Sequence, residues 1–266
     1  MEEKYNKLLE ILKSCGSLAV AFSGGVDSAF LLYAAKEALN DRVLALTGKA
    51  EMVPDRELSE ALDFCRSRGI RQRVIGLHAL DSEAFAENPP ERCYICKKMI
   101  FTSFIEAARE EGFSFLAEGS NVDDEGDYRP GLKALKELGV LSPLKAAGLN
   151  KAEIRALSKR FGLPTWDKPS YACLASRFPY GERITSEKLK MVDEGEEILR
   201  RYGFGQLRVC IHGNIARIEL PAGDFARLAD EGLRTEIYGE FKKLGFAYTA
   251  LDLLGYRSGS MNETLK

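Results

Sequence analysis

The stretch SLAVAFSGGVDSAFLLYAAKEAL, residues 17–39, decides the fold class. Its apolar run from Ser17 to Phe22 predicts a buried strand, and the apolar residues from Ala29 to Leu39 predict a helix. Between the two lies SGGVDS, residues 23–28. A strand that enters a helix through a glycine turn is typical of an α/β protein with a parallel sheet.

The same order of elements recurs along the first part of the chain. This alternation predicts parallel pairing, right-handed crossovers and a doubly wound, mostly parallel sheet with helices on both faces. A second polar loop, GSNVDD at residues 119–124, also follows a strand, and such sheets bind ligands at the carboxyl ends of their strands. The further predicted strands are 42–46, 73–77 and 113–117, and the further predicted helices are 56–68 and 100–108.

Prolines interrupt this pattern at two places. The stretch 83–96 contains Asn88-Pro89-Pro90 and is predicted to be a loop. Asn150 and Glu153 form a capping-box pattern for a helix, and a proline-containing loop follows it. Beyond that loop we predict a long helix, two strands joined by a tight turn, two helical stretches and a short strand. The predicted domains are therefore 1–170, and a smaller C-terminal α+β domain at 171–266.

Composition narrows the class of protein. The 266 residues carry a formal net charge of −2 and no block of basic residues, which argues against a nucleic-acid partner. The apolar stretches are too short to span a membrane, and the first residues lack a signal-type apolar core, so we expect a cytoplasmic protein. Six cysteines in such a protein indicate metal binding or redox chemistry rather than a disulfide frame.

The loop SGGVDS has the features of an anion site. Its backbone N–H groups and the following helix N-terminus can hold a phosphate, and glycines let the backbone approach closely. A Walker-type lysine is missing, which excludes a kinase or GTPase P-loop. A tight glycine turn capped by serine is the alternative structural explanation. The residues assigned to phosphate are Ser23, Gly24, Gly25, Val26, Asp27 and Ser28, with Asp27 either capping the helix or holding Mg²⁺.

SGGVDS resembles the signature of the PP-loop ATP pyrophosphatases. The resemblance implies an adenine nucleotide α hydrolase-like domain that binds ATP with Mg²⁺ and grips the leaving pyrophosphate. GSNVDD resembles the second nucleotide segment of that superfamily, although an Asx-rich turn would also explain it. The further nucleotide contacts implied by the resemblance are Thr47, Gly119, Asn121 and Asp124.

A longer set of motifs resembles the LarE family within this superfamily. The resemblance implies an enzyme that adenylylates a pyridinium dicarboxylate mononucleotide and makes thiocarboxylates for the nickel-pincer nucleotide cofactor of lactate racemase. It also implies a homo-oligomer. In chain order the motifs are PERCYICKK, GSNVDDEGDYRPG, LSPL, LPTWDKPSYACLASRFPYGERIT, RVCIHGNIARIE and GYRSGSMN.

The cysteines bear on the source of sulfur. In one branch of the family the cysteine matching Cys173 gives up its own sulfur and becomes dehydroalanine. The additional pair Cys93 and Cys96 resembles a second branch, in which three cysteines hold a [4Fe-4S] cluster whose free iron carries a sulfide. We predict the cluster version. A zinc half-site and a metal-free redox pair remain alternatives for CYIC.

Four other residues are candidates for substrate contact. Tyr94 would stack on the pyridinium ring, and Arg177 would bind a phosphate or carboxylate. Glu197 and Arg208 match family positions that contact substrate phosphate or metal, although solvated charges would explain both. Cys65 is predicted to be a core residue and Cys15 to lie in a turn. Cys210 is predicted to be structural, where relatives often carry a basic residue.

Two rival functions share part of this evidence. A tRNA thiolase has the same loop and often a three-cysteine cluster, but it needs a basic groove. A nucleotide sensor would bind ATP without turnover. Stimulation by tRNA and steady release of pyrophosphate separate these rivals from the LarE-type reaction.

Overall fold

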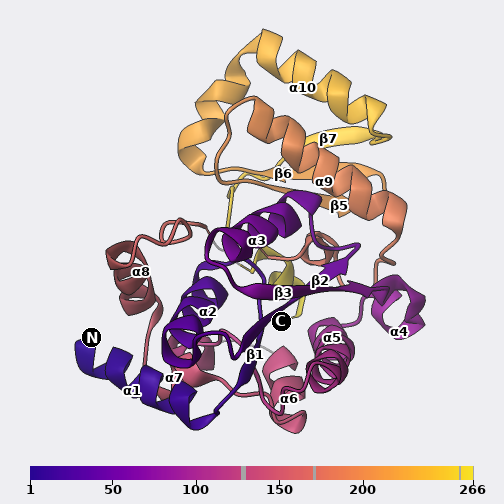
Figure 1. The fold of residues 1–266 in the computed structure, drawn as a ribbon. Coiled ribbons are helices and arrows are strands. Elements are labelled where there is room, and N and C mark those ends of the chain that lie inside the picture. Colours follow the sequence, from indigo (N-terminus) through magenta and orange to yellow (C-terminus); the bar gives the residue numbers. More distant parts are fainter. Residues whose placement is uncertain (127–129, 170–171, 258, 266) are drawn as a thin grey trace. The chain divides into compact units, whose positions relative to one another are not determined.

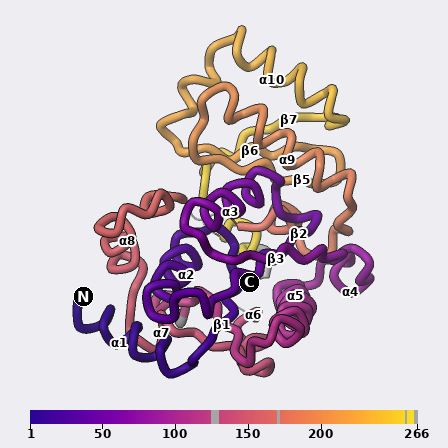
Figure 2. Tube along the Cα trace, viewed as in Figure 1, coloured from indigo at the N-terminus to yellow at the C-terminus, as the bar shows by residue number. Residues whose placement is uncertain are grey.

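The computed structural model describes residues 1–126, 130–169, 172–257 and 259–265. The chain divides into two compact units, coloured along the sequence in Figures 1 and 2. The first comprises Met1–His78 and Cys93–Tyr171, and the second Ala79–Arg92 and Ala172–Lys266. The predicted boundary at residues 170 and 171 lies outside the described residues, as do 127–129 of the GSNVDDEGDYRPG motif and Ser258 of GYRSGSMN.

The first unit is built on a parallel sheet. Its strand order is β3-β2-β1-β4, and every described pairing is parallel, as the sequence predicts. β1 and β2 each lead into an α-helix, because buried apolar runs alternate with helical segments, whereas β3 and β4 are followed by 3₁₀ helices. The strands are β1 (Leu18–Ala21), β2 (Val43–Ala50), β3 (Arg71–Leu77) and β4 (Leu116–Ala117).

Successive side chains of β1 pack into two separate hydrophobic cores, one on each face of the sheet. Leu18 and Val20 pack with residues of the helices on one face, whereas Ala19 packs with apolar residues of α5 (Arg92–Glu110) on the other. Figure 1 shows α2 (Val26–Leu39) and α5 on opposite sides of β1. The doubly wound prediction is therefore confirmed. The other helices of this unit are α1 (Glu2–Ser14), α3 (Asp55–Ser67), α6 (Pro130–Glu137), α7 (Pro143–Ala146) and α8 (Lys151–Arg160), with the 3₁₀ helix Val122–Gly126.

The predicted loop at 83–96 is wrong at both of its ends. A short helix, α4 (Glu83–Ala86), occupies its start, and α5 begins at Arg92. The two prolines lie just before that helix, where a missing N–H costs nothing, and Arg92 donates its backbone N–H to the carbonyl of Pro89 (2.9 Å). Cys93 and Cys96 therefore lie in the first turns of a long helix.

The second unit is the smaller α+β unit that the sequence predicts. Its sheet has the order β5-β6-β7, with an antiparallel β5–β6 hairpin and a parallel β6–β7 pair. The strands are β5 (Arg208–His212), β6 (Ile215–Glu219) and β7 (Tyr248–Leu251), and the main helices are α9 (Ser186–Arg201) and α10 (Glu231–Lys243). The 3₁₀ segments are Ala79–Asp81, Leu174–Arg177, Ala222–Ala229 and Ser260–Leu265.

A search of the described helices for a span long and apolar enough to cross a membrane found none.

Candidate functional site

The SGGVDS segment at residues 23–28, called the phosphate loop from here on, connects β1 to α2 within the first unit. Gly24 has φ +74°, a left-handed conformation that favours glycine, and Gly25 is the N-cap of α2. The N–H groups in the first turn of a helix have no carbonyl partners in that helix, so they are available to an anion. Ser28 Oγ donates to the carbonyl of Gly25 (3.2 Å) and lies 3.1 Å from Ser23 Oγ, which fixes the loop.

The second predicted nucleotide segment packs directly on this loop. A Cβ atom at Gly119 would lie 2.9 Å from the backbone nitrogen of Ser28, so only glycine permits this approach. Asn121 Nδ2 donates to Asp27 Oδ1 (3.4 Å), and the backbone N–H of Asn121 donates to Asp124 Oδ2 (2.9 Å). The structure thus brings SGGVDS and GSNVDD together.

A buried carboxylate supports the turn between these segments, and motif reasoning missed it. Glu118 follows β4 and is 6% exposed. It accepts hydrogen bonds from the backbone N–H of Ser120 (3.0 Å), from Ser120 Oγ (2.7 Å) and from Ser142 Oγ (2.6 Å). A buried charge requires such partners, so the bonds fix the backbone that leads into Asn121.

Two lysines beside the phosphate loop were also missed. The Lys151 ammonium forms an ion pair with Asp27, and its backbone N–H donates to Asp123 Oδ2 (2.9 Å). Lys168 Nζ donates to the carbonyl of Gly24 (3.1 Å) and lies 2.5 Å from Glu60 Oε2. Lys151 is the first residue of the capped helix α8, and Lys168 lies in the quoted LPTWDKPSY stretch. Cationic groups at this loop complement a triphosphate.

Asp27 and Thr47 are two predicted nucleotide residues with different surroundings. Asp27 does not cap α2; its carboxylate is 23% exposed and faces Asn121 and Lys151. Such an oxygen donor beside an anion loop fits Mg²⁺. Thr47 is 4% exposed, and its hydroxyl donates to the carbonyl of Phe22 (2.9 Å) while accepting from Gln72 Nε2 (2.8 Å). In this structure the Thr47 side chain is buried, and it links β2 to the residue that follows β1 and to β3.

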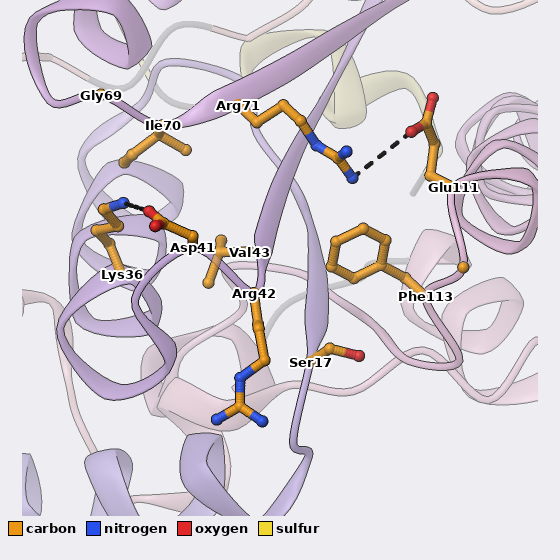
Figure 3. A pocket seen from close by; sticks show the side chains of 11 residues that line it. Ser17, Lys36, Asp41, Arg42, Val43, Gly69, Ile70, Arg71, Glu111 and Phe113 are labelled. Atoms are coloured by element: carbon orange, nitrogen blue, oxygen red, sulfur yellow. Dashed lines mark hydrogen bonds and ion pairs between the residues drawn. The ribbon is translucent and has the colours of Figure 1, made fainter.

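A cavity of about 380 Å³ lies at the opposite, amino end of the same sheet (Figure 3). Val43 and Arg71, which line it, are the first residues of β2 and β3. Lys36 pairs with Asp41 at 2.6 Å, and Arg71 pairs with Glu111 at 3.5 Å. Parallel sheets bind nucleotides at the carboxyl ends of their strands, so this cavity is not the nucleotide site.

Cys93 and Cys96 lie on α5 and form no disulfide. Residues three apart on a helix share one face, and Cys93 is exposed while Cys96 is partly buried. Between them, Tyr94 donates its hydroxyl to Glu137 Oε2 (2.7 Å), and this bond to the carboxylate raises the pKa of Tyr94. Lys133 Nζ lies 5.6 Å from the Tyr94 ring centroid, so the ring already stacks with a cation.

Cys173 belongs to the second unit, where it precedes the 3₁₀ helix Leu174–Arg177 and is exposed. Arg177 is 3% exposed, and its Nε donates to Glu196 Oε1 (2.7 Å). This predicted substrate residue therefore ties the Cys173 loop to α9 in the structure. Within the described ranges, no group of three or more His, Cys, Asp or Glu side chains is assembled for a metal ion.

The other predicted residues of the second unit lie on α9 and β5. The Glu197 side chain is 53% exposed and lies 3.5 Å from Arg200. Arg208 donates to the carbonyl of Arg257 (2.9 Å) and stacks on Tyr256, with 4.7 Å from its Cζ to the ring centroid. Cys210 is fully buried, and burial raises its pKa to about 12.

Buried Cys65 on α3 has a pKa of about 12 for the same reason, which agrees with its predicted place in the core. Cys15 lies at the C-cap of α1, as a turn residue should.

Comparison with known proteins identifies relatives over almost the whole chain. A pyridinium-3,5-bisthiocarboxylic acid mononucleotide synthase of Lactiplantibacillus plantarum is 38% identical over 262 residues, covering 97% of this chain and 93% of the relative. An uncharacterised protein of Synechocystis is 37% identical over 265 residues, covering 100% and 99%. A component of the glutamine-hydrolysing GMP synthase of Thermoplasma volcanium is 27% identical over 206 residues, covering 70% and 64%.

A scan against protein-family models gave no match. The two relatives above 30% identity cover nearly the whole chain and so establish its family, and the GMP synthase component is a more distant relative. The chain therefore belongs to the LarE family of ATP-dependent enzymes, within the PP-loop ATP pyrophosphatase superfamily.

Proposed function

We propose that the chain uses ATP to activate a pyridinium carboxylate mononucleotide and then replaces a carboxylate oxygen with sulfur. The product would serve the nickel-pincer nucleotide cofactor. The observation that carries this proposal is the close packing of Gly119 on Ser28, because it brings SGGVDS and GSNVDD together where both would contact a nucleotide. The activity named for the Lactiplantibacillus relative supports the choice of substrate.

In the activation step, a carboxylate oxygen of the substrate attacks the α phosphorus of ATP. The bond from that phosphorus to the bridging oxygen breaks, and pyrophosphate leaves. The N–H groups at the start of α2 would stabilise the charge of the leaving group, assisted by Lys151 and Lys168. Asp27 would hold Mg²⁺, which neutralises phosphate charge.

In the transfer step, a sulfur nucleophile attacks the carbonyl carbon of the acyl adenylate. The bond from that carbon to the AMP oxygen then breaks, and AMP leaves with the oxygen. We propose Cys93, Cys96 and Cys173 as the ligands of a [4Fe-4S] cluster, which would supply sulfide from its fourth iron. These cysteines form no disulfide, two of them are exposed, and thiolate sulfur is the donor type that suits iron.

A second candidate for the sulfur source is Cys173 itself, because its thiol is exposed on a loop of the second unit. Its Sγ would attack the adenylate to form a thioester. Removal of the Cα proton would then break the Cβ–S bond and leave dehydroalanine. Iron content and the visible absorbance of anaerobically purified protein distinguish the two sources, because the second needs no iron.

The test of the proposal is incubation with ATP, Mg²⁺ and the pyridinium carboxylate mononucleotide. We expect pyrophosphate, AMP and a product in which one sulfur has replaced one oxygen. The variant Asp27→Asn should lose most of this activity, whereas Asp63→Asn, an exposed side chain on α3, should keep it. Pyrophosphate release without sulfur in the product would leave only the activation step.

We further propose that the enzyme acts as a cytoplasmic homo-oligomer on a small molecule. The net charge of −2 favours a small-molecule substrate over tRNA. Added tRNA should therefore leave pyrophosphate release unchanged, and light scattering should give a mass above 29.5 kDa. Stimulation by tRNA would favour the thiolase alternative.

A further inference from the structure

The segment before α5 is bonded to the loop that follows Cys173, and both belong to the second unit. The backbone N–H of Gly181 donates to the carbonyl of Asn88 (2.9 Å), and that of Ile184 donates to the carbonyl of Ala86 (2.8 Å). Two stretches some 90 residues apart thus run together through backbone bonds. The side chains of Asn88 and Arg92 complete this connection.

Arg92 is an arginine buried to 4% exposure. Its guanidinium donates to the carbonyl of Ala175 (2.8 Å) and to the side-chain oxygen of Asn88. The same group lies over the ring of Tyr180, 5.5 Å from the centroid. A buried cation needs such acceptors, so its contacts fix the loop on both sides of Arg177.

Asn88 supplies one of the acceptor oxygens for Arg92. It is fully buried and has φ +55°, a left-handed conformation that is uncommon for a residue other than glycine. Its Nδ2 donates to the carbonyls of Pro179 (2.6 Å) and Phe178 (3.4 Å). The strain is tolerated because these bonds hold the side chain between Arg92 and the loop.

Arg92 is adjacent in sequence to one of the proposed cysteine ligands and contacts the loop that carries another. The next residue is Cys93, and the carbonyl that Arg92 holds lies two residues after Cys173. We propose that Arg92 is a positioning residue, which fixes the Cys173 loop on the segment that leads into the Cys93–Cys96 helix. Groups that orient metal ligands typically change metal affinity or activity by about 10-fold to 100-fold when removed. The inference rests on the proposed sulfur-transfer function.

An exposed ion pair connects the same two stretches at the surface and provides a matched control. Arg183 pairs with Glu83, and their side chains are 54% and 66% exposed. Exposed ion pairs contribute little, whereas Arg92 is enclosed. The variants Arg92→Ala, Arg92→Lys and Arg183→Ala therefore separate positioning from the mere presence of an arginine between these segments.

The first readout is hydrogen exchange of the full-length protein, which requires neither ATP nor iron. Arg92→Ala should speed the exchange of amides at 175–181 about 10-fold, while the β5–β6 amides keep their protection. Arg92→Lys should recover part of the protection, and Arg183→Ala should match the wild type. Unchanged exchange at 175–181 in a folded Arg92→Ala protein would overturn the proposal. Should Arg92→Ala fail to fold, Arg92→Lys decides: exchange equal to wild type overturns it.

The second readout is iron uptake, measured as bound iron and visible absorbance after anaerobic reconstitution. Arg92→Ala should bind about 10-fold less iron than wild type at the same iron concentration, and Arg183→Ala should bind an equal amount. Normal iron uptake by Arg92→Ala would refute the positioning role even if its loop exchanges faster.

Wild-type protein that binds no iron would contradict the cluster assignment, and Cys173 would then be compared as the sulfur donor in wild type and Arg92→Ala. Conversion of Cys173 to dehydroalanine, in which its sulfur leaves with the product, is measured as the protein mass during one turnover. It should be about 10-fold slower in Arg92→Ala. An equal rate would overturn the inference. In this way failure of the cluster proposal and failure of the Arg92 proposal give different results.

Discussion

The phosphate loop at residues 23–28 is ordered mainly by its own residues, whereas the loop after Cys173 is ordered mainly by side chains from distant segments. The first depends on a left-handed Gly24, on bonds between its own serines and on the start of α2. The second depends on Arg92 and on the Arg177–Glu196 pair. The turn of the phosphate loop is therefore encoded in six consecutive residues, although Gly119, Lys151 and Lys168 also contact it. The loop after Cys173 depends more on partners that its own sequence does not contain.

The largest effect should come from breaking the buried pair of the second unit. In Arg177→Met, the carboxylate of Glu196, 1% exposed, loses its partner at 2.7 Å and keeps only the more exposed Arg200 at 2.9 Å. The free energy of unfolding should fall by about 3–5 kcal/mol in urea titrations. The double variant Arg177→Met/Glu196→Leu should recover much of this loss, because it also removes the buried carboxylate and leaves Arg200, 21% exposed, near solvent. A loss below about 1 kcal/mol in the single variant would contradict the comparison.

The next effect concerns the close approach in the first unit. In Gly119→Ala the new Cβ would lie 2.9 Å from the Ser28 nitrogen, so backbone has to move. An overpacking cost of about 1–3 kcal/mol, if it falls on the bound state, corresponds to about 5-fold to 140-fold weaker ATP binding. Calorimetric titration with ATP and Mg²⁺ measures the dissociation constant of each variant. The control is Gly76→Ala, whose Cβ would meet nothing within 4 Å; it should bind ATP normally.

A third prediction compares buried and exposed thiols. The thiolate is the reactive form, and burial raises the pKa of Cys65 and Cys210 to about 12. Iodoacetamide at about pH 8 should therefore modify exposed Cys93 and Cys173 first and leave these two unmodified in the folded protein. Peptide mass mapping measures the order. Early modification of Cys210 would mean that the β5–β6 sheet opens readily.

The smallest effect belongs to the cap of α8, which places Lys151 at the phosphate loop. Hydrogen bonding from Lys4 and from the backbone of Asn150 lowers the pKa of Glu153 below its ordinary 4.5. A lowered folded pKa stabilises the protein above 4.5, and this contribution is lost as the pH falls through the lowered value. Glu153→Gln should flatten that part of the stability profile. An unchanged profile, measured by thermal melting, would show that the cap contributes nothing measurable.

The fold and part of the candidate site could be predicted from sequence because their signals are local. Buried runs, glycines and caps indicated the parallel sheet. The strand-end rule placed SGGVDS and GSNVDD at the same edge, where the structure has a bond from Asn121 to Asp27. The sequence pattern could not reveal Lys168, which reaches Gly24 across 144 residues. Glu118 was not predicted for a related reason. Its partners include Ser142, and a hydrogen bond between residues distant in sequence leaves no sequence motif.

The surroundings of Arg92 and Arg177 were equally hidden. Sequence reasoning assigned Arg177 to substrate because it follows a cysteine motif, but its burial and its carboxylate partner depend on how α9 packs. It assigned residues 83–96 to a loop because prolines usually interrupt helices. Here the prolines precede the helix, and Arg92 turns inward.

The most direct test of the central claim follows one oxygen atom. The pyridinium carboxylate mononucleotide is labelled with ¹⁸O in its carboxylate and incubated with enzyme, ATP and Mg²⁺, and the AMP is analysed by mass. Attack of the carboxylate on the α phosphorus, with pyrophosphate leaving along residues 23–28, predicts AMP that carries one ¹⁸O atom. AMP without label, formed together with pyrophosphate, would contradict adenylylation of the substrate.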